Sequence, residues 1–452
     1  MRPSPHIPIY RSTIRIVFKP ISLMKRKKLL IACSLIAGVI ILGAIVTGWM
    51  VYSFFTKSIF GFKTVIPAEL REPRIILGQD FLARETFLKA DQTGTVVGLL
   101  RNIGTVDDLA VGELDGKPGL DVVIAGEYGA VIADDTGNKQ SLTTYEFEAE
   151  KRKIWNFEIP VPHWAVGDFK IIDIEGDHLS EYLARGSIDG AALFAHNGKL
   201  IWSIGRTTNE KTSIKDLATG DLNGDGIVEF IVCWDNEDKD ENKDSIELFD
   251  RAGNQKWSKP LRYEYFQAEV VDVNGDGKNE IIHGDSDMLI RGPQGDVLKT
   301  VKMPIYFSNF ALCNALGTGK PQILDLQNGA VWLIDFEGKV VARFDAPLSK
   351  ISVTPTKDDP MTWVGQISAY KAEGTWVKFS DGGPEYLAIV ANFVAIDRSL
   401  IYVYSAKGQL VYHEIVPAEC NAIAVLPEVE GKSAQALLIG CGQNVWRYYP
   451  VR

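Results

Sequence analysis

The chain has 452 residues, of which 46% are apolar and 10% aromatic, which is enough for a large buried core. Its formal net charge is −10. Acidic chains are poor partners for nucleic acid, which is bound through Lys and Arg, so we expect no nucleic-acid partner. Five cysteines in a chain of this length exclude a small scaffold held together by disulfides.

The N-terminus is basic and leads into an uncharged segment. Residues 1–28 carry eight Lys or Arg and no acid, so the rest of the chain holds a net charge of −18. Residues 29–55 carry no charge, and 27 mostly apolar residues are enough to span a bilayer. The preceding basic cluster predicts a cytoplasmic N-terminus. A cleaved signal peptide is the alternative, but its apolar core is shorter and an Ala-x-Ala site should follow.

These segments predict four regions and a location. The location is that of a single-pass membrane protein with its C-terminal body outside the cytoplasm, in the periplasm or at the cell surface. The regions are a cytoplasmic basic tail (1–28), a transmembrane signal-anchor helix (29–55), a linker (56–79) and a repeat domain (80–452).

A nine-residue frame with Gly at its fourth position recurs through the repeat domain, and an apolar run typical of a strand follows most copies. Its copies are residues 113–121, 173–181, 221–229, 272–280 and 314–322. Two shorter copies, at 381–385 and 430–434, precede similar runs. Each copy predicts a hairpin, which makes seven.

A second turn, with Gly three residues after its start, follows six of these hairpins. The turns are 134–137, 195–198, 250–253, 292–295, 335–338 and 405–408. An aromatic residue stands four positions beyond the Gly at Trp202, Trp257 and Tyr412. A Gly-closed turn between two apolar runs indicates a hairpin. Each unit thus supplies four short antiparallel strands, as in a propeller blade.

The missing seventh second hairpin is predicted upstream, at residues 87–97 around Asp91 and Gly94. An N-terminal segment that completes the last blade would close the ring and remove its exposed edges. The sequence therefore predicts an all-β fold, a seven-bladed β-propeller of four-stranded blades preceded by one transmembrane helix. Six and eight blades are the alternatives.

Two copies of the frame have the side chains of a cation loop. Oxygen-bearing residues fill positions 1, 3, 5 and 9, and glycines fill positions 4 and 6. Hard cations such as Ca²⁺ take carboxylate and amide oxygens at alternate residues of a sharply turning loop. The candidate ligands are Asp221, Asn223, Asp225 and Glu229 in one copy and Asp272, Asn274, Asp276 and Glu280 in the other. The alternative is a plain Asx-Gly turn without metal.

The frame Asp-x-Asn-Gly-Asp-Gly-x-x-Glu before an apolar strand resembles the FG-GAP/VCBS repeat propellers, which include integrin α heads and bacterial surface proteins. The resemblance covers residues 80–450 and implies structural Ca²⁺, with ligands meeting other loops of the ring. It adds the carbonyls of Ile227 and Lys278 as calcium ligands.

The resemblance also ranks the other copies. The copy with Asp173, Glu175, Asp177 and Glu181 departs from the pattern, since Glu stands at position 3 and His178 at position 6, so we expect a weaker third site. Lys117 in the first copy and Leu316 in the fifth predict turns without a cation.

Two further features stay open. Cys420 and Cys441 flank the last predicted hairpin, so they form either a disulfide or two buried thiols. Residues 348–375 form a long connection, our first candidate for a contact surface.

The sequence lacks the linear motifs of zinc hydrolases, of phosphate-binding loops and of serine or cysteine nucleophiles. We therefore expect no enzyme but a membrane-tethered, calcium-binding module for protein or glycan binding, as in cell adhesion. The alternatives are a polysaccharide lyase-like or quinoprotein-like propeller enzyme, and a docking platform within a larger envelope assembly.

Overall fold

All residues that the computed structural model describes belong to one of the chain's two units, residues 64–357 and 361–452. The described residues are 66–88, 105–114, 116–117, 119–126, 129–137, 139–144, 152–154, 157–159, 166–174, 179–186, 190–196, 199–205, 212–236, 244–261, 267–284, 287–306, 310–313, 321–353, 365–380, 382–393, 396–427 and 435–451. The predicted basic tail and transmembrane helix lie outside them. Within them, no helix has the length and apolar character needed to cross a membrane.

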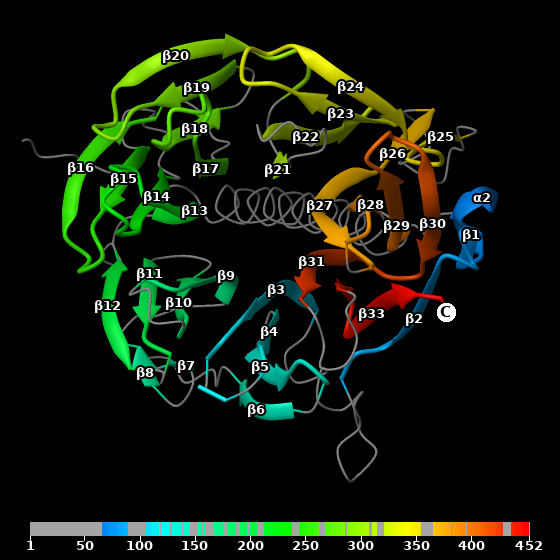
Figure 1. Ribbon diagram of the computed structural model, residues 1–452, viewed down its shortest axis with the longest axis horizontal. Coiled ribbons are helices and arrows are strands. Elements are labelled where there is room, and N and C mark those ends of the chain that lie inside the picture. Colours follow the sequence, from blue (N-terminus) through cyan, green and yellow to red (C-terminus); the bar gives the residue numbers. More distant parts are fainter. Residues whose placement is uncertain are drawn as a thin grey trace, which may run out of the picture. The chain divides into compact units, whose positions relative to one another are not determined.

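The unit is a seven-bladed β-propeller (Figure 1). Blade 1 contains β3 (Val106–Gly112), β4 (Asp121–Gly126), β5 (Gly129–Asp134) and β6 (Lys139–Thr144). Blade 2 contains β9 (Val166–Ile172), β10 (Glu181–Gly186), β11 (Gly190–Phe194) and β12 (Leu200–Gly205). Blade 3 contains β13 (Thr212–Gly220), β14 (Glu229–Asn236), β15 (Ser245–Phe249) and β16 (Gln255–Pro260). Blade 4 contains β17 (Gln267–Val271), β18 (Glu280–Gly284), β19 (Asp287–Arg291) and β20 (Val297–Lys302).

The remaining three blades complete the ring. Blade 5 contains β21 (Ala311–Cys313), β22 (Gln322–Gln327), β23 (Ala330–Ile334) and β24 (Val340–Asp345). Blade 6 contains β27 (Tyr370–Lys378), β28 (Glu385–Phe393), β29 (Arg398–Ser405), β30 (Leu410–Val416) and a fifth strand, β1 (Arg74–Leu77). Blade 7 contains β31 (Cys420–Leu426), β32 (Ala436–Cys441), β33 (Asn444–Pro450) and β2 (Leu82–Thr86).

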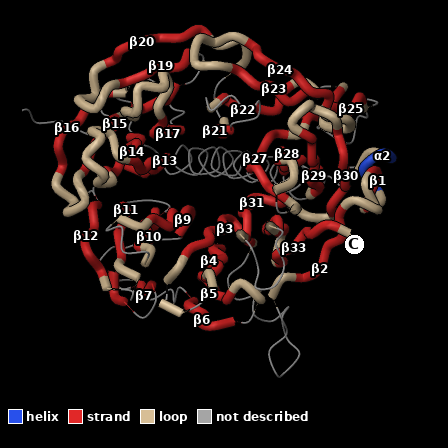
Figure 2. Tube along the Cα trace, viewed as in Figure 1, coloured by secondary structure: helices blue, strands red, loops and turns tan. Residues whose placement is uncertain are grey.

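Within a blade, neighbouring strands are antiparallel, and the strands follow one another from the centre of the ring to its rim. Figure 2 shows β13 near the centre and β16 at the rim. The middle strands are apolar along most of their length because neighbouring blades cover both of their faces; every residue of β4 is buried. The outer strands alternate, and β16 exposes every second residue. This difference in pattern follows from the stacking of blades.

Two small sheets lie between blades. β7 (Arg152–Ile154) pairs with β8 (Phe157–Ile159) between blades 1 and 2. β25 (Lys350–Ser352) pairs with β26 (Gln366–Ser368) between blades 5 and 6. The second pair lies in the long connection predicted at 348–375. That connection ends sooner than predicted, because β27 begins at Tyr370.

The ring closes where the N-terminal strand β2 pairs with β33, near the C-terminus. The sequence predicted closure by an N-terminal segment, which is confirmed, but it placed that segment at residues 87–97, which is wrong. The closing element is the strand Leu82–Thr86 directly before it. Only one strand is needed, because β31, β32 and β33 already supply three. Residues 89–97 lie outside the described part of the chain.

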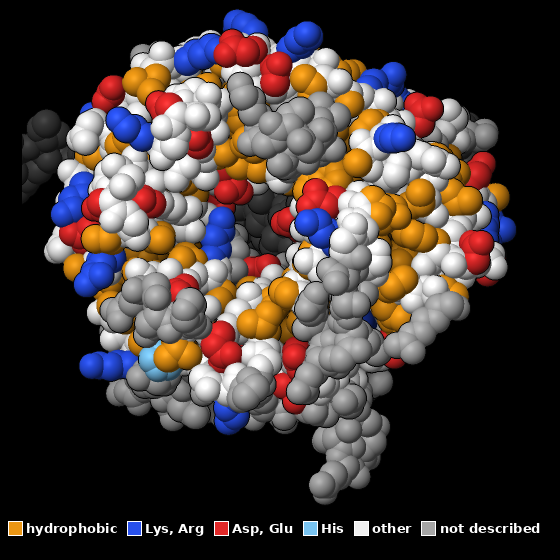
Figure 3. Space-filling view, viewed as in Figure 1, with side chains coloured by type: hydrophobic (Ala, Val, Ile, Leu, Met, Phe, Trp, Pro, Cys, Tyr) orange, Lys and Arg blue, Asp and Glu red, His pale blue; other side chains and the backbone are white. Residues whose placement is uncertain are grey.

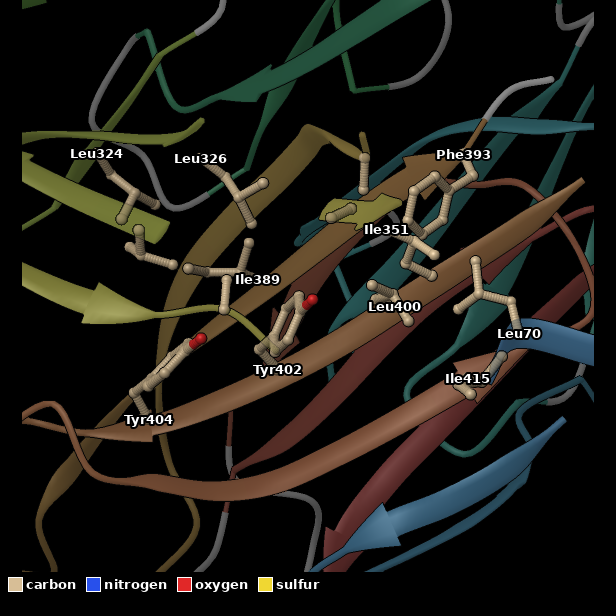
Figure 4. Packing of buried hydrophobic residues seen from close by; sticks show 14 of the residues in the cluster. Leu70, Leu324, Leu326, Ile351, Ile389, Phe393, Leu400, Tyr402, Tyr404 and Ile415 are labelled. Atoms are coloured by element: carbon tan, nitrogen blue, oxygen red, sulfur yellow. The ribbon is translucent and has the colours of Figure 1, made fainter. Parts of the chain in front are cut away.

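The region assigned to a linker also contributes to the propeller. Its short helix α2 (Ala68–Arg71) places Leu70, with no exposed surface, in the core of blades 5 and 6. Figure 4 shows Leu70 beside Ile415 and Leu400, in the same cluster as Tyr402 and Ile389. Together with β1, this segment covers the outer edge of blade 6 and extends the folded unit N-terminal of residue 80.

A disulfide joins Cys420 in β31 to Cys441 in β32. The two residues are paired in register at the end of the hairpin. From this position the sequence predicted either a disulfide or two buried thiols. The structure decides for the disulfide.

Candidate metal centre

Both predicted calcium loops connect the first strand of a blade to its second strand. Residues 221–228 join β13 to β14 in blade 3, and residues 272–279 join β17 to β18 in blade 4. The glycines at positions 4 and 6 of both loops have φ between 78° and 83°, and a Cβ on any of them would meet no atom within 4 Å. The left-handed backbone of the turn, rather than crowding, therefore requires Gly at these positions.

The first aspartate of each loop holds the turn through backbone N–H groups. Asp221 Oδ1 accepts from Gly224 N at 2.6 Å, and its Oδ2 accepts from Gly226 N at 2.8 Å. Asp272 makes the corresponding two bonds at 2.6 and 2.8 Å. Burial alone would raise the pKa of Asp221, but these backbone donors outweigh it and lower the pKa.

Positions 3 and 5 repeat one Asx turn. Asn223 Oδ1 accepts from Asp225 N at 2.8 Å, and Asp225 Oδ1 accepts from Ile227 N at 2.8 Å. The second loop reproduces both bonds at 2.8 Å each. Two loops 51 residues apart in the sequence thus share one hydrogen-bond frame. This agreement indicates a built arrangement of oxygen atoms rather than two unrelated turns.

The acid at position 9 is the buried end of each loop. Glu229 is 9% and Glu280 6% exposed, and each accepts a hydrogen bond from the backbone N–H at position 2, at 2.9 and 3.1 Å. Burial raises the pKa of Glu229, and the charges of Asp225 and Asp221 raise it further. Glu280 has its pKa raised in the same way, by burial and then by its loop's two aspartates. Like charges therefore gather in each loop, which a divalent cation would relieve.

The sequence did not reveal that the position-9 acid braces its own loop. In blade 1, Asp121 Oδ2 accepts from Leu114 N at 2.9 Å, and in blade 2, Glu181 Oε2 accepts from Ile174 N at 2.9 Å. Since the blade 1 copy lacks a ligand at position 5, the brace does not depend on a cation. The signal in the sequence was the acid at this position even where the other ligands are lost.

In blades 2 and 4, position 8 links the loop to the loop of the preceding blade. Asn279 Nδ2 donates to the carbonyl of Asp221 at 2.7 Å, and Ser180 N donates to the carbonyl of Glu113 at 2.7 Å. Inner strands also approach closely, since a Cβ on Gly220 would lie 2.4 Å from Val270. The two best loops are thus neighbours, hydrogen-bonded to one another on one side of the ring.

The residues present fit a hard cation in donor type and in charge. No three Asp, Glu, His or Cys side chains are gathered tightly enough to hold a metal ion as they stand within the described ranges. Positions 3 add amide oxygens to the carboxylates of both loops. Of the weaker third loop, Asp173 and Glu181 are described, whereas Glu175 and Asp177 lie outside the described residues. Calcium therefore stays a prediction for all three loops.

Comparison with known proteins supports the architecture. No protein-family model matches the chain, and no curated protein matches it either. The solved structures do give matches. BBS1N, in complex with ARL6DN, is 10% identical and covers 82% of this chain and 96% of its own, with a TM-score of 0.51.

The fold is that of a β-propeller. The Dos1 propeller is 11% identical over 81% of both chains, with a TM-score of 0.44. The rhamnogalacturonan lyase PL11 of Bacillus licheniformis is 11% identical over 76% of this chain and 71% of its own, with a TM-score of 0.41. At these identities the likeness concerns the fold alone.

Proposed function

We propose that this chain is a membrane-tethered, extracytoplasmic β-propeller, stiffened by Ca²⁺, that binds a protein or glycan partner. The observation that carries the proposal is the pair of adjacent loops with one shared hydrogen-bond frame and six carboxylates. The N-terminal segment 29–55 supplies the tether.

In this proposal the ion is structural. Asp221, Asn223, Asp225, Glu229 and the carbonyl of Ile227 hold one Ca²⁺. Asp272, Asn274, Asp276, Glu280 and the carbonyl of Lys278 hold another. The loop at Asp173 is the weaker third site. The ion offsets the repulsion between the carboxylates within each loop. Without the ion, the loop would keep this repulsion, because its hydrogen bond to the neighbouring blade holds it in place.

Two observations support a compartment outside the cytoplasm. The disulfide between Cys420 and Cys441 is of a kind that persists in oxidising compartments and is rare in the cytosol. The basic residues before segment 29–55 favour retention of the N-terminus inside. Both observations support a propeller outside the cytoplasm.

The rigid scaffold supports a binding role in this proposal. A ring closed at both edges with short hairpin loops presents a stable surface to a partner, and such loops commonly carry binding functions. The BBS1N structure is that of a complex with another protein, which agrees with a protein partner for this chain. The enzymatic alternative stays a prediction, to be tested by assaying polysaccharide cleavage and alcohol oxidation.

The test uses the full chain in lipid nanodiscs, incubated with extracytoplasmic extract and with a glycan array, in calcium or in a chelator. We expect a discrete partner that is retained in calcium and reduced at least severalfold in chelator. Asp225→Asn with Asp276→Asn should behave in calcium as the wild type does in chelator. Catalytic turnover of a sugar polymer without a retained partner would contradict the proposal.

A further inference from the structure

At the rim of the ring, each blade is fastened to the next at its second turn. Trp202 of β12 in blade 2 donates its indole N–H to the carbonyl of Arg251 at 3.0 Å. Trp257 of β16 in blade 3 donates to the carbonyl of Pro293 at 2.8 Å. Both carbonyls belong to the second residue of the next blade's turn. The same indole contact thus recurs at two consecutive blade boundaries.

The turn glycines make room for these rings. A Cβ on Gly253 would lie 2.8 Å from the ring of Trp202, and one on Gly295 would lie 3.1 Å from the ring of Trp257. Between blades 5 and 6 the ring of Phe344 approaches Gly408 in the same manner, at 2.2 Å from such a Cβ. An aromatic ring therefore lies over the turn glycine at these three blade boundaries.

The boundary between blades 4 and 5 lacks this ring. Lys299 occupies the strand position of the tryptophans, because it pairs with Ile290 as Trp257 pairs with Leu248. Its ammonium group forms an ion pair with Glu337 in the next turn. The atoms nearest to a Cβ on the glycine of that turn, Gly338, belong to Lys302 and Val301 of blade 4.

A pocket of about 680 Å³ lies at this boundary, in the size range of ligand sites. Ile290, Leu298, Phe336 and Val341 form apolar walls, and Leu298 is 58% exposed. Figure 3 shows acidic and basic side chains next to each other at the top of the view, where Figure 1 places β20 and β24. The missing indole has left an open, partly apolar groove.

The charges that line the groove favour basic residues on either side of a bound side chain. Glu280, Asp335 and Glu337 line it with a single cation, Lys299. The groove therefore carries a net charge of −2 in the absence of Ca²⁺. Without Glu280, which the calcium loop would use as a ligand, Asp335, Glu337 and Lys299 leave a net charge of −1. The backbone carbonyl of Phe336 holds the turn position of Arg251 and Pro293, so it can accept an N–H as they do.

We propose that this groove docks a tryptophan side chain, flanked by Lys or Arg, from a segment of a partner protein. The partner's indole enters the groove beside Leu298 and Phe336, near Lys299, and its basic neighbours meet the acidic wall. Buried tryptophans flanked by charge complementarity are common anchors of protein interfaces. This inference rests on the proposed binding function and names its surface.

The test uses the full chain in nanodiscs and the acetylated, amidated peptide Lys-Lys-Trp-Lys-Lys, with a matched peptide in which Ala replaces Trp. Calorimetry should detect the tryptophan peptide below about 1 mM and should find the alanine peptide at least tenfold weaker. Equal binding of the two peptides would reduce the attraction to charge alone and overturn the proposal. So would no binding up to about 1 mM.

Two variants of β20 test whether peptide binding depends on the groove or only on charge near it. Leu298→Lys puts a cation on the groove wall and should weaken the tryptophan peptide about tenfold. Val297→Lys puts the same charge one residue away, at a side chain that is 46% exposed and outside the groove lining, and should change affinity less than twofold. Equal effects of the two variants would overturn the proposal.

A third variant uses the protein's own precedent. Lys299→Trp should fill the groove, abolish peptide binding and raise the melting temperature.

Other outcomes distinguish the groove from the proposed function. If the protein binds oligosaccharide but not the peptide, and Leu298→Lys removes the oligosaccharide binding, a glycan site would replace the proposal. If the native protein still captures its partner after Leu298→Lys, the groove assignment fails while the proposed function stands. If the wild type captures nothing, the proposed function itself fails.

Discussion

A half-buried ion pair joins the closing strand β2 to the neighbouring blade 6. Arg84 of β2 lies 2.5 Å from Glu414 of β30, whose side chain is 2% exposed. Tyr412 and Tyr448 donate hydroxyl hydrogen bonds to the same carboxylate at 2.7 and 3.1 Å. The guanidinium also lies 4.6 Å from the centre of the Trp446 ring. One arginine thus fastens blade 7 to blade 6.

Arg84→Met keeps the apolar stem and removes the cation. Removing one partner of a buried pair costs about 3–5 kcal/mol, and the lost contact with the Trp446 ring adds about 0.5–1. Two tyrosine hydroxyls still solvate Glu414, and the Arg84 side chain is 31% exposed, so we take the lower end. The expected loss of unfolding free energy is about 3 kcal/mol.

Urea unfolding of the full chain measures this loss, and hydrogen exchange shows where it acts. We expect faster exchange in β2 and β33 than in blades 3 and 4. Glu414→Gln alone and with Arg84→Met completes a double-mutant cycle, in which the pair should show a coupling energy above about 1 kcal/mol. Additive effects, or a loss below about 0.5 kcal/mol for Arg84→Met, would refute the account of ring closure.

Three other perturbations follow from the geometry. Gly253→Ala places a Cβ 2.8 Å from an indole ring at φ 78°, so it should lower the free energy of unfolding by about 2–3 kcal/mol. Gly224→Ala has the same φ but no atom within 4 Å of the new Cβ, so in the same urea assay it should lower the free energy of unfolding by only about 1 kcal/mol. Burial and a neighbouring guanidinium lower the pKa of His283 from 6.5 to about 3, so the stability present above pH 6.5 should fall by about 1.4 kcal/mol per unit as pH drops below it. His283→Gln should remove that slope, and an unchanged slope would contradict the assignment. Cys420→Ser opens a loop of 21 residues closed by Cys441 and should lose about 3 kcal/mol, which calorimetry of the reduced wild type should match.

The repeat architecture was predictable because it is written in local signals. A left-handed turn admits Gly at little cost, so Gly116, Gly224 and Gly275 mark the first turns of blades 1, 3 and 4. The second turns close on Gly in the same way; for example, Gly253 N donates to the carbonyl of Asp250 at 2.9 Å. Seven units counted from such marks are confirmed as seven blades.

Features that depend on long-range packing were not predictable in this way. A turn at Gly78 precedes the closing strand Leu82–Thr86, but the strand pairs with β33, far along the chain, and so its place is set by the free edge of β33. The brace at position 9 and the link from Asn279 to Asp221 need the loop's folded geometry. The groove between blades 4 and 5 had a sequence signal, Lys299 where two units have Trp, but its meaning appears only when the indoles are seen to fill the boundaries.

Calcium titration of the full chain by calorimetry tests the central claim most directly. The account predicts two sites of comparable affinity and a weaker third. Asp225→Asn should remove one of the two, and Asp276→Asn should remove the other. Asp287→Asn, which changes a partly exposed acid outside the loops, should leave both intact. Absence of binding heat in the wild type, or a stoichiometry that neither loop variant changes, would contradict the account.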